Sequence, residues 1–232
     1  MASPLTTLPM LRLAFASILA LVPLVSQAQR PPAGLVGRIE GDTYISATGA
    51  FKMTIPVRSE LGGVISDTQF LVSFQDDYST HISVVAEAQD ATERWELQTR
   101  GMKDYLRYFF NHYAFDEFKR NDKDASIQSA LFLPDLYDGA LVVYVLLPGG
   151  SVFTGAHPVL VAPKTPPVAK RGNLVFIRNG FIYIISTELA ERVTEGSAYT
   201  MTTQEEDVLL RERLTDVLHS ITFLPAPSGS FK

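Results

Sequence analysis

The chain has 232 residues, 46% of them apolar and 19% charged, which is the composition of a globular protein with a full core. Its net charge of −5 argues against nucleic acid, which requires a basic face, and against anionic membranes, which attract polybasic clusters. The absence of cysteine excludes disulfides, thiol nucleophiles and cysteine metal sites.

Residues 1–28 have the three parts of a secretory signal. Arg12 supplies the positive charge, residues 13–25 the apolar stretch, and Ser26 to Ala28 the small residues before a cleavage site. The alternative is an uncleaved anchor, but the apolar run is shorter than the ~20 residues that span a bilayer. We therefore expect a periplasmic or extracellular protein without a stable membrane span after cleavage, and a flexible lead-in over residues 29–36.

Alternating apolar and polar residues predict the first strands of the mature chain. Residues 44–46 and 51–56 form one expected hairpin, and residues 64–74 and 81–88 form a second pair.

A long helix is expected next. Asp90 and Glu93 have the spacing of a capping box. Apolar side chains then recur at three- and four-residue intervals, which predicts one buried face. This face contains Trp95, Met102, Tyr105, Leu106, Phe109, Phe110 and Tyr113. Gly101 lies inside the pattern and favours a bend or a break there.

After the helix, residues 126–133 and 139–147 predict another hairpin. Residues 148–172 follow and contain five prolines and four glycines, so we expect an irregular segment that is either functional or disordered. Residues 158–162 within it offer an alternative edge strand.

The strongest local signal is residues 173–186, two apolar runs around Asn179 and Gly180. This pair favours the positive φ angles of a type I′ turn. A two-residue turn sets Arg178 opposite Phe181 and, further along, Val175 opposite Ile184. Because both runs are apolar on both faces, they are expected at the centre of a covered sheet.

The last predicted helix starts with a capping box at Thr203 and Glu206. Its expected buried stripe consists of Leu210, Leu214, Val217, Leu218 and Ile221. A closing strand over residues 221–224 and a disordered tail over residues 226–232 complete the chain. Residues 37–225 are therefore expected to form one α+β domain, with a central antiparallel β-sheet and helices packed on its faces, an α/β/α-type sandwich.

No pattern of catalytic, metal-binding or cofactor-binding residues is present. The four histidines are isolated in sequence, and neither Gly-x-Ser-x-Gly nor a glycine-rich phosphate loop occurs. We predict no catalytic residue, no metal site and no cofactor.

A binding surface is nevertheless expected, because the long helix has more aromatic rings than one stripe can bury. We place it at an apolar cleft between this helix and the sheet, with residues 148–172 as a flap. The candidate residues are Phe110, Tyr113, Phe115, His157, Lys164, Lys170 and Arg171.

The order of elements resembles the PsbP-like fold, named for an extrinsic subunit of the photosynthetic oxygen-evolving complex and shared by several exported bacterial proteins. The resemblance includes the opening Tyr44-Ile-Ser to Ile55-Pro56, the hairpin Phe176-Ile-Arg-Asn-Gly-Phe-Ile-Tyr183 and the ending Leu218-His-Ser-Ile-Thr-Phe223. It implies a central antiparallel sheet between helical layers and a non-enzymatic role as an accessory or binding protein. It transfers no catalytic residue, and residues 148–172 depart from its compact pattern.

These observations favour an exported, non-enzymatic binding or accessory protein of the cell envelope, whose partner is an envelope protein or an amphiphilic small molecule. One alternative is an exported hydrolase-type enzyme with a scattered active site. Another is a structural envelope protein that associates with itself through an exposed strand edge.

Overall fold

The computed structural model describes residues 34–78, 80–148, 150, 168–189, 191–195 and 198–225. The predicted signal, most of the lead-in, residues 151–167 of the proline-rich segment and the tail lie outside the described residues. Within the described part, no helix is both long enough and apolar enough to cross a membrane.

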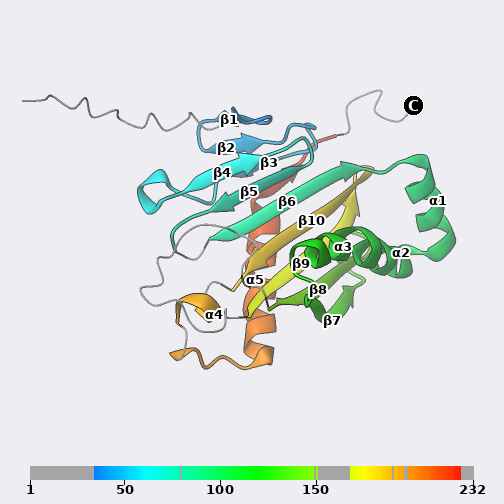
Figure 1. Cartoon of the computed structure of the whole chain (residues 1–232). Helices are drawn as coiled ribbons and strands as arrows, with labels where there is room; N and C mark the ends of the chain where they lie inside the picture. The colour runs from blue at the N-terminus through cyan, green and yellow to red at the C-terminus, as the bar shows by residue number, and fades with distance from the viewer. Residues whose placement is uncertain are drawn as a thin grey trace, which may run out of the picture. The chain divides into compact units, whose positions relative to one another are not determined.

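A seven-stranded antiparallel sheet forms the centre of the described structure, in the order β4-β5-β6-β10-β9-β8-β7 (Figure 1). Its strands are β4 (Val64–Asp67), β5 (Leu71–Gln75), β6 (His81–Ala88), β7 (Ser126–Leu133), β8 (Ala140–Leu147), β9 (Ala169–Arg178) and β10 (Phe181–Glu188). The predicted central hairpin is β9 and β10, and it lies inside this order, with β6 on one side and β8 on the other.

The register of the central hairpin is confirmed. Arg178 pairs with Phe181 and Val175 with Ile184, as a two-residue turn requires. Asn179 and Gly180 have φ angles of 51° and 76°, so the turn uses the left-handed region that these two residues tolerate best.

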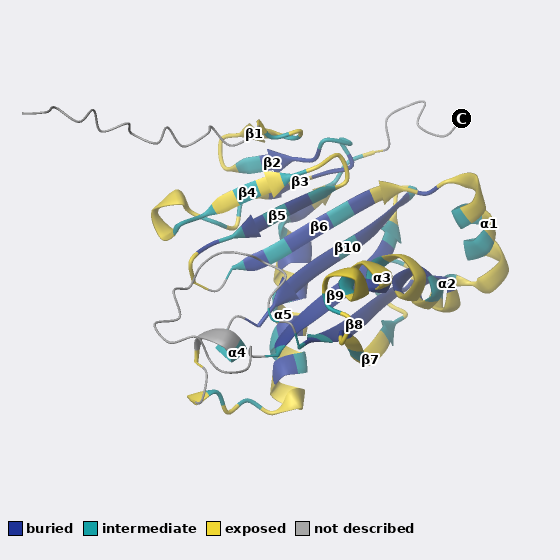
Figure 2. Ribbon diagram, in the orientation of Figure 1, coloured by how far each residue is buried: buried dark blue, intermediate teal, exposed yellow. Residues whose placement is uncertain are grey.

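Both faces of the sheet are covered, which confirms the α+β class and the helix-covered sheet. Alternate residues of β9 and β10 point to opposite sides and belong to two separate hydrophobic clusters. On one side they pack with helix α5 (Thr203–Ser220), and on the other with α2 (Met102–Phe109), the π-helical turn η2 (Phe110–Ala114) and α3 (Phe115–Asn121). Figure 2 shows the central strands as the most continuously buried part of the chain.

A second, four-stranded sheet has the order β1-β2-β3-β11. It consists of β1 (Arg38–Glu40), β2 (Thr43–Ile45), β3 (Phe51–Thr54) and β11 (Ile221–Phe223). The opening hairpin and the closing strand were predicted, but their pairing in a separate sheet, and β1 itself, were not. Because β11 pairs with β3, the end of α5 is held beside the first hairpin.

The predicted strand over residues 64–74 is two strands. A turn closed by the bond from the Thr68 N–H to the Leu71 carbonyl separates β4 from β5, and the two then pair as a hairpin. The short 3₁₀ helix η1 (Ser59–Leu61) precedes them.

The predicted long helix is divided into α1 (Ala91–Arg100), α2, η2 and α3. Gly101 has φ 77°, which ends α1, while the capping box at Asp90 and Glu93 forms as expected. The change of direction at Gly101 alters the buried face, so Trp95 is 63% exposed instead of buried.

The predicted capping box of α5 was displaced by one residue. Thr202 is the N-cap and pairs reciprocally with Glu205, whereas Glu206 points into the interior. The expected stripe of α5, which includes Leu210, Leu214 and Leu218, is buried. The short helix α4 (Glu191–Thr194) precedes this part of the chain.

Candidate functional site

A groove of about 370 Å³ lies where the C-terminal half of α5 passes β3, β6 and β10. Its apolar lining consists of Met53, Pro56, Ile82 and Val217, and its hydroxyl groups belong to Thr54, Thr80, Thr187 and Ser220. Arg213 and Asp216 add one charge of each sign. An apolar cavity with a few convergent polar groups is the usual form of a small-molecule site.

Two features of the fold position the wall of the groove. Gly172 of β9 lies under α5, where an added Cβ would come within 3.1 Å of Leu214, so the absence of a side chain permits close packing of the helix. At the other end, Ser220 is followed directly by β11, in which Ile221 pairs with Met53. The middle and the C-terminal end of the helix are therefore held against the strands, and the groove lies beside its last turns.

The charge of Arg213 is compensated by a partly buried carboxylate. Arg213 Nη1 donates to Glu191 Oε2 at 3.1 Å, and Nη2 donates to Oε1 of the same carboxylate. Burial favours the neutral acid, but the hydrogen bonds and charge of Arg213 outweigh it and hold the pKa of Glu191 below its usual range. Arg213 is thus committed to Glu191.

Unlike Arg213, the Asp216 side chain is exposed at the groove and forms no ion pair with any described residue. The ionisable residues of the groove's described lining are Arg213 and Asp216. The described residues also hold no group of three or more His, Asp and Glu side chains suited to a metal ion. Apolar surface beside a few polar groups is an arrangement suited to binding a ligand.

A second hollow of about 440 Å³ lies along the outer side of α5. Its described lining comes only from residues 201–212, which form one helix and the residues just before it. The α5 groove is lined from three strands and a helix, and we take it as the candidate site.

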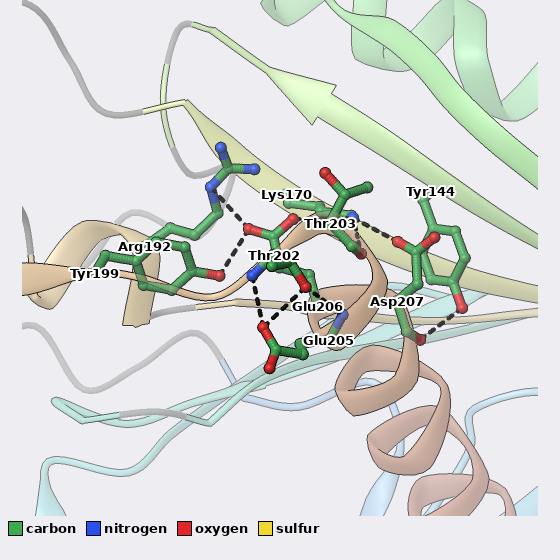
Figure 3. Close-up of polar contacts among 9 residues, drawn as sticks. All are labelled: Tyr144, Lys170, Arg192, Tyr199, Thr202, Thr203, Glu205, Glu206 and Asp207. Carbon is green, nitrogen blue, oxygen red and sulfur yellow. Dashed lines mark hydrogen bonds and ion pairs between the residues drawn. The ribbon is translucent and has the colours of Figure 1, made fainter.

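A buried ion-pair cluster holds the beginning of α5 against β9 (Figure 3). Lys170 is fully buried, and its Nζ lies 3.0 Å from Glu206 Oε2 and also contacts Asp207. Tyr199 Oη donates to Glu206 Oε1 at 2.7 Å, and Tyr144 Oη donates to the Asp207 carbonyl at 2.8 Å. These contacts join three separate segments at the N-terminal end of the helix that walls the groove.

Arg171 forms a second buried cluster on the opposite face of the sheet. Its Nη2 donates to Ser83 Oγ at 2.7 Å, and its Nη1 lies 3.3 Å from Glu188 Oε1. Burial lowers the pKa of the Arg171 guanidinium, and Glu188 opposes this effect. Ser83 is therefore a buried partner of a guanidinium, and we assign it no nucleophilic role.

The predicted aromatic surface is not a single surface. Phe110 and Phe115 are 1% and 8% exposed and belong to the core between the sheet and helices α2 and α3. Tyr113 is 52% exposed and packs against the Phe109 ring at 5.2 Å. The side chains of η2 that face the sheet are thus buried, and Tyr113 lies on the outside.

The cationic residues that were predicted to line the binding surface do not form one described group either. Lys170 and Arg171 were assigned to an irregular segment over residues 148–172, but β9 begins at Ala169 and buries both in ion pairs. Their partners, Glu206 and Glu188, are distant in sequence, so no local pattern indicates that the two cations are paired. His157 and Lys164 lie outside the described residues.

The sequence interpretation did not identify the groove. Its residues come from four separate parts of the chain, and hydroxyl-bearing residues near strand ends have no distinctive spacing. The only local signal is that Arg213, Asp216 and Ser220 share one side of α5, next to the predicted apolar stripe.

No protein-family model matches the chain, and no curated protein sequence matches it significantly. Among solved structures, it is similar to cyanobacterial PsbP from Synechocystis, with 13% identity and a TM-score of 0.46 over 84% of this chain and all of that one. It is also similar to the Saccharomyces cerevisiae Ran-binding protein Mog1p, with 10% identity and a TM-score of 0.40 over 83% of this chain and 97% of that one. The PsbP-like fold expected from the sequence is thus among the folds of these similar structures. The similarity concerns the fold alone. Neither similarity assigns a ligand or a partner to this chain.

Proposed function

We propose that this chain is an exported, non-enzymatic binding protein of the cell envelope that holds a small amphiphilic molecule in the α5 groove. One observation carries the proposal: the groove combines an apolar lining from Met53, Ile82 and Val217 with hydroxyl groups from three strand ends and α5. Apolar surface supplies affinity, and a few polar groups fix the orientation of the ligand.

The size of the groove favours a small molecule over an envelope protein as its occupant. A volume of about 370 Å³ lies within the range of small-molecule sites, roughly 300–1,000 Å³. A stable protein interface typically buries about 800 Å² on each partner, which requires a far larger surface than this groove.

Binding of the neutral dye N-phenyl-1-naphthylamine, followed by its fluorescence, tests the proposal. Ser220→Phe places a ring in the groove and is expected to weaken dye binding at least tenfold. The matched control is Thr215→Phe, which adds the same ring to an exposed position of α5 outside the groove. Unfolding curves of both variants verify that they fold. Absence of dye binding by the wild type, or equal binding by Ser220→Phe, would contradict the proposal.

Export is part of this proposal and has its own test. Residues 1–28 are proposed to be removed when the full chain is produced with its signal in a bacterium. N-terminal sequencing of the protein recovered from the periplasm is then expected to start at Gln29. A product that starts at Met1 in the membrane fraction would favour the uncleaved anchor.

Self-association is a second candidate function, favoured by the outer strand β7. This strand has eight residues without charge or proline, and among the described strands only β8 pairs with it. The other edge, β4, has four residues, and its Asp67 binds the Val36 and Gly37 N–H groups. Edges without charges or prolines are prone to pairing with another strand.

Variants with one introduced cysteine test self-association. The chain has no cysteine of its own, so each variant can form only intermolecular disulfides. In an antiparallel pair of two copies, a residue near the twofold axis lies about 4.5–5.5 Å from its equivalent, within disulfide reach. Ser129→Cys, Ala130→Cys and Leu131→Cys scan the strand, and Val64→Cys on β4 is the control. Self-association predicts a disulfide dimer at one β7 position; monomers throughout would remove this candidate.

A further inference from the structure

The charges around the α5 groove indicate which head group its ligand has. Arg213 donates two hydrogen bonds to Glu191, so its positive charge is already compensated. Asp216 forms no ion pair with a described residue, although it lines the same groove. Among the described residues that line the groove, the uncompensated charge is therefore one carboxylate, that of Asp216.

We propose that the α5 groove selects a cationic amphiphile, with the positively charged head group at Asp216 and the apolar body on Met53, Ile82 and Val217. This inference rests on the proposed binding function and adds the charge of the ligand. A cation beside Asp216 gains a charge-assisted contact, whereas an anion of the same length meets an uncompensated carboxylate.

Two further contacts support this arrangement. Glu191 is held ionised by Arg213 and stays close to the groove, so Arg213 is not released to bind an anion without leaving Glu191 uncompensated. The hydroxyl of Ser220 donates to the Val217 carbonyl at 2.6 Å, and its oxygen can still accept a bond from an ammonium group. Ser220, one turn along α5 from Asp216, can therefore accept a hydrogen bond from a donor head group.

Three probes of equal chain length test the proposal: octylamine, octanol and octanoate. Their dissociation constants are measured by calorimetry at pH 7 and low salt, below their aggregation concentrations. We expect octylamine to bind about two- to fivefold more tightly than octanol, the range for a partly exposed ion pair. Octanoate is expected to bind more weakly than octanol, and added salt should reduce the difference between amine and alcohol.

The variant Asp216→Asn is expected to remove the preference for octylamine over octanol. The matched control is Glu212→Gln, which removes one carboxylate from α5 at a position outside the groove and is expected to keep the preference.

The outcomes separate the two proposals. Failure of all three probes to bind contradicts the binding function itself. Binding of octanol or octanoate as tight as that of octylamine, or an Asp216→Asn variant that keeps the amine preference, overturns only the selection of a cation.

Discussion

Lys170 of β9 and Glu206 of α5 lie 3.0 Å apart, Nζ to Oε2, although 36 residues separate them in sequence. Both side chains are buried, and Asp207 also contacts the ammonium group. This ion pair is a buried polar link between the central hairpin and the helix that walls the groove. A buried charge that loses its partner is costly, so the link is directly testable.

The variant Lys170→Met is expected to lower the free energy of unfolding by about 3–5 kcal/mol, because it removes the buried cation of Glu206 and Asp207. Only the partly exposed Arg192, at 3.5 Å, then remains to compensate the buried Glu206 carboxylate. The double variant Lys170→Met with Glu206→Leu is expected to lose less than the sum of the single variants. Urea unfolding at pH 7 gives both values. As a matched control, Arg38→Met breaks the exposed Arg38–Glu40 pair and should cost less than about 1 kcal/mol. A loss from Lys170→Met as small as that of the control would show that the cluster does not stabilise the fold.

Asp67 provides a prediction on acid stability. Burial favours its neutral form, but hydrogen bonds from the Gly37 and Val36 N–H groups and from the Tyr44 hydroxyl outweigh burial and lower the pKa of Asp67. A carboxyl with a lowered folded-state pKa stabilises the protein above its unfolded-state value of 3.8, and this contribution is lost as pH falls through the folded-state pKa.

Asp67→Asn is therefore expected to be less stable than the wild type at pH 7, with a difference that shrinks as the pH falls below about 4. Urea unfolding at pH 7, 5 and 3 measures it. A difference that stays constant over this range would mean that the charge of Asp67 does not stabilise the contact between β4 and the small sheet.

The turn of the central hairpin gives a third prediction. Gly180 has φ 76°, a conformation that costs an L-residue about 1–2 kcal/mol. Gly180→Ala should therefore destabilise the protein by about this amount. Gly180→Asn should cost less, because asparagine tolerates the left-handed region better. Equal losses from the two variants, measured by thermal unfolding, would indicate that backbone conformation is not the cause.

The aromatic residues of η2 give a fourth prediction, on the stability of the fold. Phe110 is 1% exposed, so Phe110→Ala removes a core ring and is expected to cost about 3–5 kcal/mol. Tyr113 is 52% exposed, and Tyr113→Ala is expected to change the stability by less than about 1 kcal/mol. Denaturant unfolding compares them under one condition. A larger loss for Tyr113→Ala would contradict the assignment of η2's buried and exposed sides.

Local patterns predicted the features of the fold that depend on neighbours in sequence. The Asn179–Gly180 turn determined the register of β9 and β10, because two residues with positive φ permit only one pairing. The capping box at Asp90 and the stripe from Leu210 to Leu218 are likewise local signals. The PsbP-like order of elements followed from these signals together.

The features that were missed depend on distant contacts. The proline-rich composition of residues 148–172 predicts an irregular segment that includes Lys170, and nothing near Lys170 in sequence points to Glu206. The hairpin predicted over residues 44–46 and 51–56 is present as β2 and β3, but only the pairing of β3 with β11 shows that it belongs to a second sheet. The α5 groove needs β3, β6, β10 and α5 in place at once, so no single segment contains its pattern.

The position of the bound ligand is the most direct test of the account. Octanol is titrated into the protein while the methyl resonances of residues on both faces of the sheet are followed by NMR. We predict shifts at Met53, Ile82 and Val217, which line the groove, and none at Ile177 and Ile184, which face α2 and α3. Shifts confined to Ile177 and Ile184, or no shifts at all, would contradict the assignment of the α5 groove as the binding site.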